Sequence, residues 1–546
     1  MGKTWILMVT CAIMLSGMEA FACTGLLVGK KASVDGSVMI SYAADSHTLY
    51  GELYRWPAVT WPKGAMLDII EWDTHKPLGQ IPQVEQTYSV VGNMNEHQVA
   101  ITESTFGGRP ELVDTTGIMD YGSLIYVTLQ RSKTAREAIR IMTDLVKDYG
   151  YYSSGETFSI ADKNEAWVME MIGKGPGNKG AVWVAIRIPD DCISAHANQS
   201  RIQQIPFDDK ENCIYSPDVV SFAREKGYFS GRDKDFSFQK AYCPYDFSAL
   251  RGCEARVWSF FRKYDKSMDQ YMDLIKGDVM KKPMPLYVKP DRLLSVRDVQ
   301  NGMRDHFEGT DLDMTKDAGA GPYKVPYRWR PMTFEVDGQE YTNERAIATQ
   351  QTGFVIVPQM RNWLPDAVGG ILWFGVDDAD MAVFTPIYCS VTASPECYRV
   401  GNGDMMNFSW TSAFWIHNWV ANMAYGKYSY MIQDIRLVQQ ELENSYQQTI
   451  PAVDKAASEL YAKNPAEAVK FLTWFSSTTA DQATARWKKL GEYLLVKYMD
   501  GNVKKEENGH FKQNGYGLSE YPDFPGYDED YYRSIVKSAG DKLKVK

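Results

Sequence analysis

Beyond its first residues the sequence has no long apolar run and no concentrated stretch of Lys and Arg. No segment after residue 22 approaches the ~18 consecutive apolar residues that a membrane-spanning helix requires, so we expect no membrane span. The formal net charge of the chain is -10, and no basic stripe is present that would neutralise phosphates. We therefore expect no nucleic-acid partner.

Cysteine and histidine are also scarce, with 8 and 7 residues in a chain of 546. None of their spacings matches a structural zinc site, and the H-E-x-x-H pattern of zinc hydrolases is absent. We therefore predict neither a metal site nor a cofactor. The cysteines that follow Cys23 are even in number, which permits disulfides in an exported protein, and Cys243/Cys253 and Cys389/Cys397 are plausible pairs.

The first 22 residues have the pattern of a cleavable secretion signal. A basic start at Lys3 is followed by an apolar stretch and by Ala20-Phe21-Ala22, an A-x-A ending directly before Cys23. Cleavage there would leave a chain that begins with cysteine and is exported to the periplasm or the medium. The alternative is a lipidated Cys23 that anchors the protein to a surface, although Ala20 and the bulky Phe21 do not fit that motif.

A cysteine at the start of a chain carries a thiol and a free α-amino group on one residue. The amine titrates near pH 7.7–8.0 and the thiol near 8.5, so the amine can accept the thiol proton directly or through one water. The thiolate can then attack an amide carbonyl, and the ammonium can protonate the departing amine. This chemistry makes Cys23 the predicted nucleophile of an amide hydrolase.

Two β-rich runs around Asp35-Gly36 predict a hairpin directly after this cysteine. Folding the chain at that turn, or at a point one or two residues earlier, brings Cys23 opposite positions between about 44 and 48, a window that contains Asp45. A second hairpin is expected from residues 86–91 and 97–105 around a polar turn at 92–96. The predicted first residue of the mature chain would thus lie beside an acidic side chain.

The remaining pattern predicts paired strands, two helices and further paired strands, which is typical of an α+β fold with helices stacked on antiparallel sheets. Helices are expected at 120–130 and at 134–149, the latter with a capping box opened by Thr134. Strands are expected at 157–161, 166–172, 181–188, 192–195, 353–357, 372–375 and 381–388, and helices at 431–446, 452–462, 465–475 and 481–499. The charged residues from Asp500 onward form either a packed tail or a partly disordered one.

Several blocks in this order resemble the cysteine-type dipeptidases of the N-terminal nucleophile (Ntn) hydrolase superfamily, relatives of bile salt hydrolases and penicillin V acylases. These blocks are Cys23-Thr24 with the following G-K-K-A-S-V-D-G-S, A-D-S at 44–46, M-N-E-H-Q-V-A-I at 94–101, S-A-H-A-N-Q-S-R-I at 194–202, A-R-V-W at 255–258, and W-L-P-D at 363–366 with W-F-G at 373–375. The resemblance implies a four-layered αββα sandwich with insertions and a helical C-terminal region.

The resemblance also implies roles for individual residues. Cys23 matches the nucleophile, and Asp45 matches the acid that contacts the terminal amine. Asn198 matches the amide that faces the oxyanion, and Arg256 matches the arginine beside the catalytic cysteine. Ser104 and Thr105 lie where relatives present a second oxyanion donor.

One position departs from the family pattern. Relatives carry an arginine three residues before the acid, where this chain has Tyr42, so either another basic residue supplies the cation or the thiol is activated differently. Tyr42 is therefore taken as a candidate substrate-binding residue. Each site residue also has an ordinary structural alternative: Asp45 as a cap, Asn198 as a turn residue, Arg256 in a surface ion pair and Cys23 in a disulfide.

The sequence as a whole predicts an exported cysteine dipeptidase that cleaves dipeptides or short peptides through a thioester. The expected organisation is a signal at 1–22, a catalytic domain at 23–400 and a helical region with a charged tail at 401–546. An acylase acting on penicillin V or bile salts would use the same residues, and a non-catalytic surface binding protein on an Ntn fold is the alternative from another class. The chain gives no indication of its oligomeric state, and a homo-oligomer is compatible with it.

Overall fold

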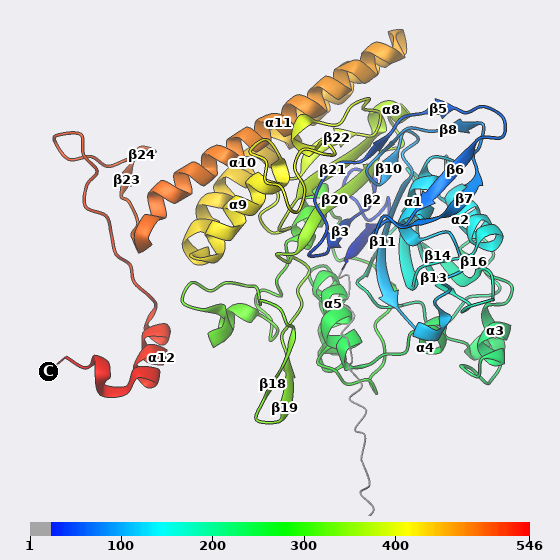
Figure 1. The fold of residues 1–546 in the computed structure, drawn as a ribbon, viewed down its shortest axis with the longest axis horizontal. Coiled ribbons are helices and arrows are strands. Elements are labelled where there is room, and N and C mark those ends of the chain that lie inside the picture. The colour runs from blue at the N-terminus through cyan, green and yellow to red at the C-terminus, as the bar shows by residue number, and fades with distance from the viewer. Residues whose placement is uncertain (1–22, 546) are drawn as a thin grey trace, which may run out of the picture.

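The computed structural model describes residues 23–545, so the predicted signal and its Cys11 lie outside the described residues. Within that range the chain folds into two large antiparallel sheets with helices around them (Figure 1). The α+β class predicted from the sequence is confirmed. No helix in the described range is long and apolar enough to cross a membrane.

The first sheet contains the start of the described chain and the strands near residue 360. Its hydrogen-bonded order is β17 (Tyr287–Val288), β15 (Ile193–His196), β1 (Gly25–Val28), β2 (Val38–Ile40), β20 (Thr352–Met360), β21 (Gly370–Val376) and β22 (Thr385–Tyr388), and β3 (Tyr42–Asp45) also pairs with β20. Strands predicted 300 residues apart in sequence thus lie side by side, which brings the region of Cys23 against residues 345–355.

The second sheet consists of the four long strands β11 to β14 and four shorter strands at its two edges. Its order is β16 (Cys213–Tyr215), β14 (Ala181–Ile188), β13 (Ala166–Gly173), β12 (Gly155–Ala161), β11 (Ala100–Gly107), β10 (Met94–Asn95), β9 (Val90–Val91) and β4 (Arg55–Trp56). Side chains along β13 alternate between two cores. Val168 joins the core shared with the first sheet, and Trp167 and Met169 join the core on the opposite face. Both faces of this sheet are therefore buried.

Helices cover the outer face of each sheet. α1 (Tyr121–Leu129) and α2 (Ala135–Tyr149) contact strands β11 to β14, whereas α5 (Ala255–Arg262) contacts β15 and α7 (Val296–Met303) contacts β20. Strands β1 and β2 contact β11, β12 and β13 between the two sheets. The shorter helices of the middle region are α3 (Val219–Glu225), α4 (Phe238–Tyr242), α6 (Met272–Ile275) and α8 (Asp366–Gly369).

The capping of α1 and α2 explains their predicted limits. The side chains of Asp120 and Thr134 accept the N–H groups of Ser123 and Glu137 at the two N-termini. The carboxylate of Glu137, however, accepts the N–H of Lys133 rather than that of the cap, so the predicted capping box is only half formed. α2 ends where Gly150 takes a positive φ of 79°.

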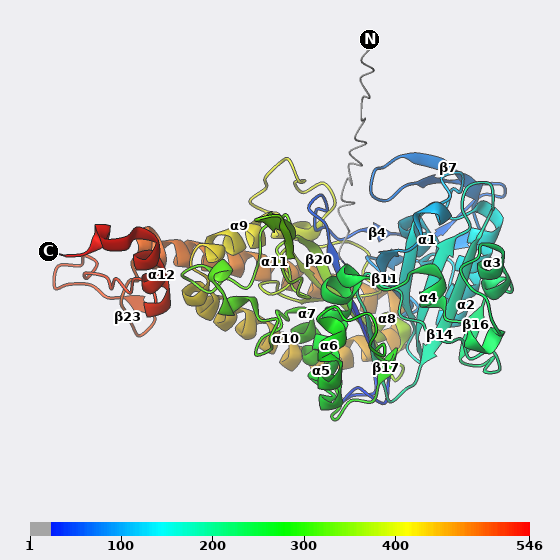
Figure 2. The same ribbon diagram turned by 90° about the horizontal axis from the view of Figure 1, so that it is seen from below.

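The C-terminal part consists of three helices and a tail. α9 (Ala413–Tyr425) is followed by α10 (Tyr428–Lys463) and α11 (Pro465–Tyr498), and α11 packs on β22. Four predicted helices merge into these last two, and α10 continues through Pro451. The tail holds β23 (Glu506–Glu507), β24 (His510–Phe511) and α12 (Glu529–Ala539), and none of the residues of α12 is buried. Figures 1 and 2 show this tail at the end of the molecule farthest from β13 and β14.

Smaller two-stranded sheets lie outside the two large sheets. They are β5 (Val59–Thr60) with β8 (Gln86–Thr87), β6 (Met66–Ile70) with β7 (Pro77–Pro82), and β18 (Thr333–Val336) with β19 (Gln339–Thr342).

The second predicted hairpin differs in detail from the observed one. The polar turn at 92–96 contains the short strand β10, because the side chain of Asn95 accepts the N–H groups of His97 and Val99 and tightens the chain there.

A buried ion pair ties α10 to the first sheet. The guanidinium of Arg361, just after β20, lies 2.5 Å from one oxygen of Asp454 and 3.2 Å from the other. Tyr388 of β22 donates a 2.7 Å hydrogen bond to the same carboxylate. The free energy of unfolding depends strongly on a buried bidentate pair of this kind, because loss of one partner leaves the other charge buried and uncompensated.

We predict that Asp454→Ala lowers the free energy of unfolding by about 3 kcal/mol, because it leaves the buried guanidinium of Arg361 without its counter-charge. Urea titration monitored by circular dichroism measures the change. Glu467→Ala is the control, since Glu467 pairs with Lys470 on the exposed face of α11 and its loss should cost less than about 1 kcal/mol. Equal effects of the two substitutions would contradict the importance of the buried pair.

Candidate active site

The predicted hairpin places Cys23 beside Asp45. Leu27 of β1 pairs with Ile40 of β2, and Thr24 forms a bridge to Ala43, which sets Cys23 across from the residue before Asp45. The backbone N–H of Asp45 donates a hydrogen bond to the thiol. Cys23 thus lies at the early end of the predicted window of 44–48, because the chain reverses about two residues before Asp35-Gly36.

Close packing fixes the direction of β1 immediately after the cysteine. Gly25 pairs with His196 of β15, and a Cβ atom at Gly25 would lie 2.5 Å from the Nε2 atom of that imidazole. Any larger residue would therefore displace the strand from the ring. The strand leads directly back to Cys23, so its position also fixes where the thiol lies.

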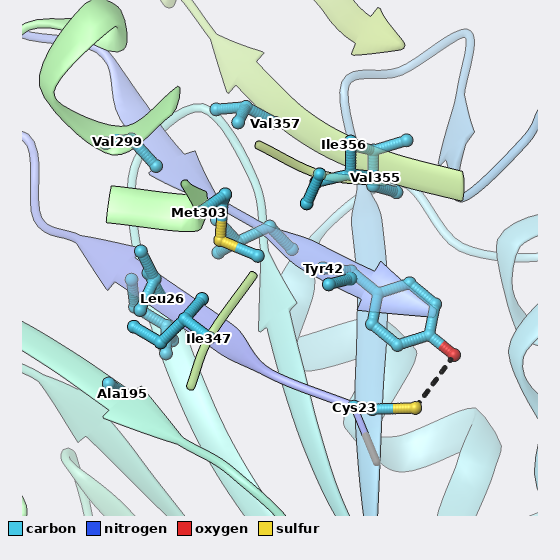
Figure 3. Packing of buried hydrophobic residues seen from close by; sticks show 14 of the residues in the cluster. Cys23, Leu26, Tyr42, Ala195, Val299, Met303, Ile347, Val355, Ile356 and Val357 are labelled. Atoms are coloured by element: carbon cyan, nitrogen blue, oxygen red, sulfur yellow. Dashed lines mark hydrogen bonds between the residues drawn. The ribbon is translucent and has the colours of Figure 1, made fainter. Parts of the chain in front are cut away.

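The thiol of Cys23 is 4% exposed and lines a cavity of ≈ 340 Å³. Its Sγ atom lies 3.6 Å from the hydroxyl of Tyr42, to which it donates (Figure 3). Burial raises the pKa of the Cys23 thiol, and the carboxylates of Glu103 and Asp45 raise it further. In a chain where Cys23 is joined to Ala22, its nitrogen is an amide and carries no charge to oppose this effect.

Asp45 is held by a cation that the sequence did not reveal. The guanidinium of Arg345 lies 2.5 Å from the Oδ2 atom of Asp45, and Thr352 donates a 2.6 Å hydrogen bond to Oδ1. Burial raises the pKa of Asp45, and its effect outweighs the opposing influence of Arg345. The ordinary reading of Asp45 as a surface cap does not fit a side chain in a buried ion pair.

Arg345 places a cation beside Asp45, which Tyr42 at the family's arginine position cannot do. The resemblance predicts an arginine at position 42, and the structure instead brings a basic residue to the acid from the segment between β19 and β20. The signal for it in the sequence was indirect, namely the absence of a cation three residues before Asp45. Because the two residues are 300 positions apart, no local spacing could have located Arg345.

Arg256 joins the cysteine to the loop that carries Asn198. One guanidinium nitrogen donates 2.8 Å hydrogen bonds to the carbonyl of Cys23 and to the hydroxyl of Thr24. The other donates to the Oδ1 atom of Asn198 at 2.9 Å and to the carbonyl of Ala197 at 3.1 Å. Burial, followed by repulsion from Arg345, lowers the pKa of Arg256 to about 10, so it stays charged at neutral pH. With 1% exposure it is no surface ion pair.

Asn198 adopts a left-handed backbone conformation with φ of 58° at the end of β15. Besides accepting from Arg256, its side chain donates a 2.7 Å hydrogen bond to the carbonyl of Thr105 on β11. Its backbone N–H donates to the hydroxyl of Ser104 at 3.3 Å. The loop is therefore anchored to both sheets, and the positive φ of a non-glycine residue is maintained by these contacts.

Ser104 and Thr105 lie differently in the second sheet. Ser104 is fully buried, and its hydroxyl also meets the Nδ1 atom of His196 at 2.6 Å. Ser159 lies 2.7 Å from the Nε2 atom of the same ring, and burial, together with the nearby Arg201 and Arg256, lowers the pKa of His196 to about 3, so that it is neutral. Thr105 instead lines a second cavity and donates a 2.7 Å hydrogen bond to Glu156.

Two cavities form a divided cleft at this site. Cys23, Tyr42 and Asp45 line the cavity of ≈ 340 Å³, whereas Thr105 and Asn198 line a neighbouring cavity of ≈ 800 Å³. Asp73 and Tyr121 line both, and the hydroxyl of Tyr121 donates a 2.9 Å hydrogen bond to Asp73. A substrate that reaches both cavities would pass the nucleophile and the Asn198 loop.

Carboxyl groups line both cavities. The cavity of Cys23 is lined by the carboxyl groups of Asp45, Glu52, Asp73 and Asp404, and by no Lys or Arg of the described chain. It also has aromatic walls, which include Trp72, Tyr126 and Phe354. The larger cavity has carboxyl groups too, and Arg109 is its one lysine or arginine among residues 23–545. Its acidic residues are Glu71, Asp73, Glu111, Asp120 and Asp246.

The predicted disulfides are absent from the structure. Cys243, Cys253, Cys389 and Cys397 are all free thiols, as is every other cysteine in the described range. Cys243 instead contacts Gln199 and the carbonyl of Phe106. No cluster of three or more His, Cys, Asp or Glu suited to a metal ion occurs in the part of the chain that is described.

The chain is similar in sequence to known peptidases. A family model described as peptidase family C69 matches residues 22–55 and 52–441. A probable dipeptidase of Latilactobacillus sakei is 27% identical over 84% of this chain and 92% of its own length. A probable dipeptidase of Salmonella dublin is 25% identical over 69% of this chain and 83% of its own. Dipeptidase A of Lactobacillus helveticus is 24% identical over 79% of this chain and 86% of its own length.

The family match covers well over half of the chain and includes Cys23, Asp45, Asn198 and Arg256. These four residues come from separate segments and converge on one site in the structure. The chain therefore belongs to peptidase family C69 and is a hydrolase of peptide bonds.

Proposed function

We propose that this protein is an exported cysteine dipeptidase that cleaves its substrate through a thioester on Cys23. The observation that carries the proposal is the placement of Cys23 between the acid Asp45 and the guanidinium of Arg256, in the wall of a cavity of ≈ 340 Å³. The curated relatives at 24–27% identity are named as dipeptidases, which supports the same substrate class.

The proposed reaction begins after removal of residues 1–22, which frees the α-amino group of Cys23. The thiol loses its proton to this amine, and the sulfur attacks the carbonyl carbon of the substrate. The tetrahedral oxyanion collapses, the C–N bond breaks, and the departing amine takes a proton from the α-ammonium. Water then attacks the thioester, which releases the acid and restores the thiol.

Release of the amine would also change the electrostatics of the thiol. In the uncleaved chain the thiol is buried beside two acids and its pKa is raised, which disfavours the nucleophilic thiolate. A protonated α-amine on the same residue places a positive charge next to the sulfur and favours thiolate. Activation is thus proposed to follow cleavage before Cys23.

The oxyanion would be stabilised from the loop at the end of β15. Asn198 is the proposed donor. Arg256 orients the side-chain amide of Asn198 by donating a hydrogen bond to its Oδ1 atom, which leaves the amide N–H groups to act as donors. Thr105 lines the adjoining cavity and is the second candidate in this region. Ser104 supports Asn198 from behind, since its hydroxyl accepts the N–H of that residue. Tyr42 lines the nucleophile's cavity and can contact a bound substrate.

The charge of the cavity favours dipeptides over N-acyl amides. A dipeptide carries an ammonium group, and the carboxyl groups of Glu52, Asp73 and Asp404 line the cavity that contains the thiol. An acylase substrate such as penicillin V has no cation on its acyl side and would leave these carboxylates without a counter-charge. The aromatic walls add space for an apolar side chain.

The arrangement of layers supports an αββα Ntn sandwich as the fold. Helices α1 and α2 cover one sheet, α5 and α7 cover the other, and the strands of the two sheets contact each other between them. Within this proposal residues 23–400 form the catalytic domain, and the α9–α11 helices with the tail form the C-terminal region. The secretion signal proposed for residues 1–22 places the enzyme in the periplasm or outside the cell.

Cys23→Ser tests the nucleophile. In protein whose N-terminus is verified by sequencing to begin at position 23, we expect the turnover of alanyl dipeptides to fall by about 10³-fold or more, because a hydroxyl is a far weaker nucleophile than a thiol at neutral pH. Turnover is measured by release of free amino acids, and melting temperature serves as the folding control. Wild-type activity in the variant, or in wild-type protein with a blocked terminus, would refute the mechanism.

N-acetylation of the substrate tests the ammonium site. Acetylated dipeptides and penicillin V should be hydrolysed at least ~10-fold less efficiently than free dipeptides, in line with loss of one charge-assisted contact. Competition assays with equal concentrations of both forms give the ratio of kcat/KM. A preference for the acetylated form would favour the acylase function instead.

Asp73 should give the binding of dipeptides a pH dependence. Burial raises the pKa of Asp73 to about 6, so its carboxylate is charged above that pH and becomes neutral as the pH falls through it. We therefore expect KM to rise as the pH drops from 7 to 5, and Asp73→Asn to show the high KM throughout. Glu492→Gln, on the exposed side of α11, removes the same charge far from the cavities and should leave the profile unchanged.

A further inference from the structure

The larger of the two cavities faces the second residue of a bound dipeptide. The proposed function places the first residue and its ammonium in the cavity of ≈ 340 Å³ that contains Cys23. Asn198, the proposed oxyanion donor, lines the neighbouring cavity of ≈ 800 Å³, so the residue after the cleaved bond extends into that cavity. In a dipeptide this residue ends in a free carboxylate. The larger cavity therefore has to accept a negative charge.

Most charged groups in the wall of this cavity would repel a carboxylate. Its acidic residues are Glu71, Asp73, Glu111, Asp120 and Asp246. Arg109 is the one lysine or arginine that lines it among the residues that the structure describes. A substrate carboxylate in this cavity thus has a single complementary charge, the guanidinium of Arg109.

The end of β11 brings Arg109 to the cavity. The pairing of β11 with β12 shifts between Thr105 and Gly107, and Gly107 and Gly108 then take positive φ values of 70° and 77°. An irregularity of this kind at a strand end changes the direction of the chain. The chain leaves the sheet along the cavity wall, which contains every residue from Thr105 to Glu111. Figure 1 shows α4 beside this end of β11.

Two contacts hold the guanidinium of Arg109 in place. Its Nε–H donates a 2.6 Å hydrogen bond to the carbonyl of Ala241 in α4. Its central carbon lies 3.8 Å from the centre of the ring of Tyr228, so the guanidinium stacks on that ring. The side chain is therefore fixed before any substrate binds, which lowers the entropic cost of a contact made through it.

The outer nitrogens of Arg109 have donors to spare. Neither Nη1 nor Nη2 donates a hydrogen bond to any residue in the described part of the chain. The carboxylate of Glu111 lies 4.0 Å from Nη1, beyond hydrogen-bond distance, and it accepts a 2.8 Å hydrogen bond from the hydroxyl of Tyr228 instead. The side chain of Arg109 is 27% exposed, so a ligand in the cavity can reach these nitrogens.

We propose that Arg109 binds the free carboxylate on the second residue of the dipeptide and makes this group a requirement for efficient binding. The paired N–H groups of a guanidinium match the two oxygens of a carboxylate. This inference rests on the proposed function and adds to it the recognition of the C-terminal end of the substrate. The ammonium lies among the carboxyl groups near Cys23, and the carboxylate lies at Arg109.

A comparison of alanyl-alanine with its C-terminal amide tests this assignment. We expect Arg109→Gln to lower kcat/KM for alanyl-alanine by about 10-fold or more, mainly through KM, because a charge-assisted contact is lost. The kcat/KM for alanyl-alanine amide should change by less than about 2-fold, since the amide carries no charge. Release of free alanine is measured for both substrates, and the difference in reactivity of the two leaving amines cancels when the variant is compared with the wild type.

The control is Arg140→Gln. Arg140 lies on the exposed face of α2, where it pairs with Glu137 and Asp144, and its substitution removes the same charge far from both cavities. The ratio of kcat/KM for the two substrates should equal that of the wild type. Arg109→Lys keeps the charge without the paired N–H groups, so we expect a smaller loss for alanyl-alanine, and this variant carries the expectation if Arg109→Gln has a reduced melting temperature.

Equal losses for the two substrates would overturn the proposal. They would show that Arg109 only braces the chain after β11 through Ala241 and Tyr228. A loss confined to the α-amide of alanyl-aspartate would also overturn it, because the guanidinium would then bind a carboxylate on the side chain and not the one at the C-terminus.

Binding to an inactive protein separates this proposal from the proposed function. Calorimetry gives the Kd of alanyl-alanine for Cys23→Ser, in protein beginning at position 23, and for the same protein with Arg109→Gln added. We expect the added substitution to weaken binding by about 10-fold or more, and an unchanged Kd would contradict the role of Arg109. A wild-type protein that cleaves no dipeptide would refute the proposed function, whereas this difference in Kd would still support the carboxylate site.

Discussion

The buried guanidinium of Arg256 is the contact on which the geometry of the site depends. From α5 it reaches the carbonyl of Cys23 and the hydroxyl of Thr24 with one nitrogen, and the Asn198 loop with the other. Three segments that are far apart in sequence are thereby fixed relative to one another. Because its donors are directed at carbonyl and amide oxygens rather than at a carboxylate, its charge remains available to the reacting groups.

The local parts of this site could be read from the sequence. The β-rich runs on either side of Asp35-Gly36 predicted a hairpin with Cys23 close to Asp45, and the chain reverses about two residues before that dipeptide. Alternating and helical patterns located most strands from β11 to β15 and both helices α1 and α2 to within one or two residues. These features depend on neighbours in the chain, for which turn chemistry, capping and hydrophobic periodicity are sufficient.

The distant parts could not be read in the same way. Arg345 meets Asp45 only because β20 lies next to β3, and no local pattern links two residues that are 300 positions apart. The long helices α10 and α11 were each predicted in two pieces. α10 continues through Pro451, because its packing against α11 outweighs the local cost of a proline inside a helix.

The pair formed by Arg361 and Asp454 links two regions that the sequence divides at residue 400. Arg361 directly follows β20 of the first sheet, and its counter-charge comes from a helix that starts after that boundary. A shortened protein that lacks the C-terminal helices would leave the guanidinium of Arg361 without its counter-charge. The apolar side chains of β22 that α11 covers would also be exposed to water. The helical region therefore acts as a structural cover for the sheet beneath it, and its removal would destabilise the remaining fold.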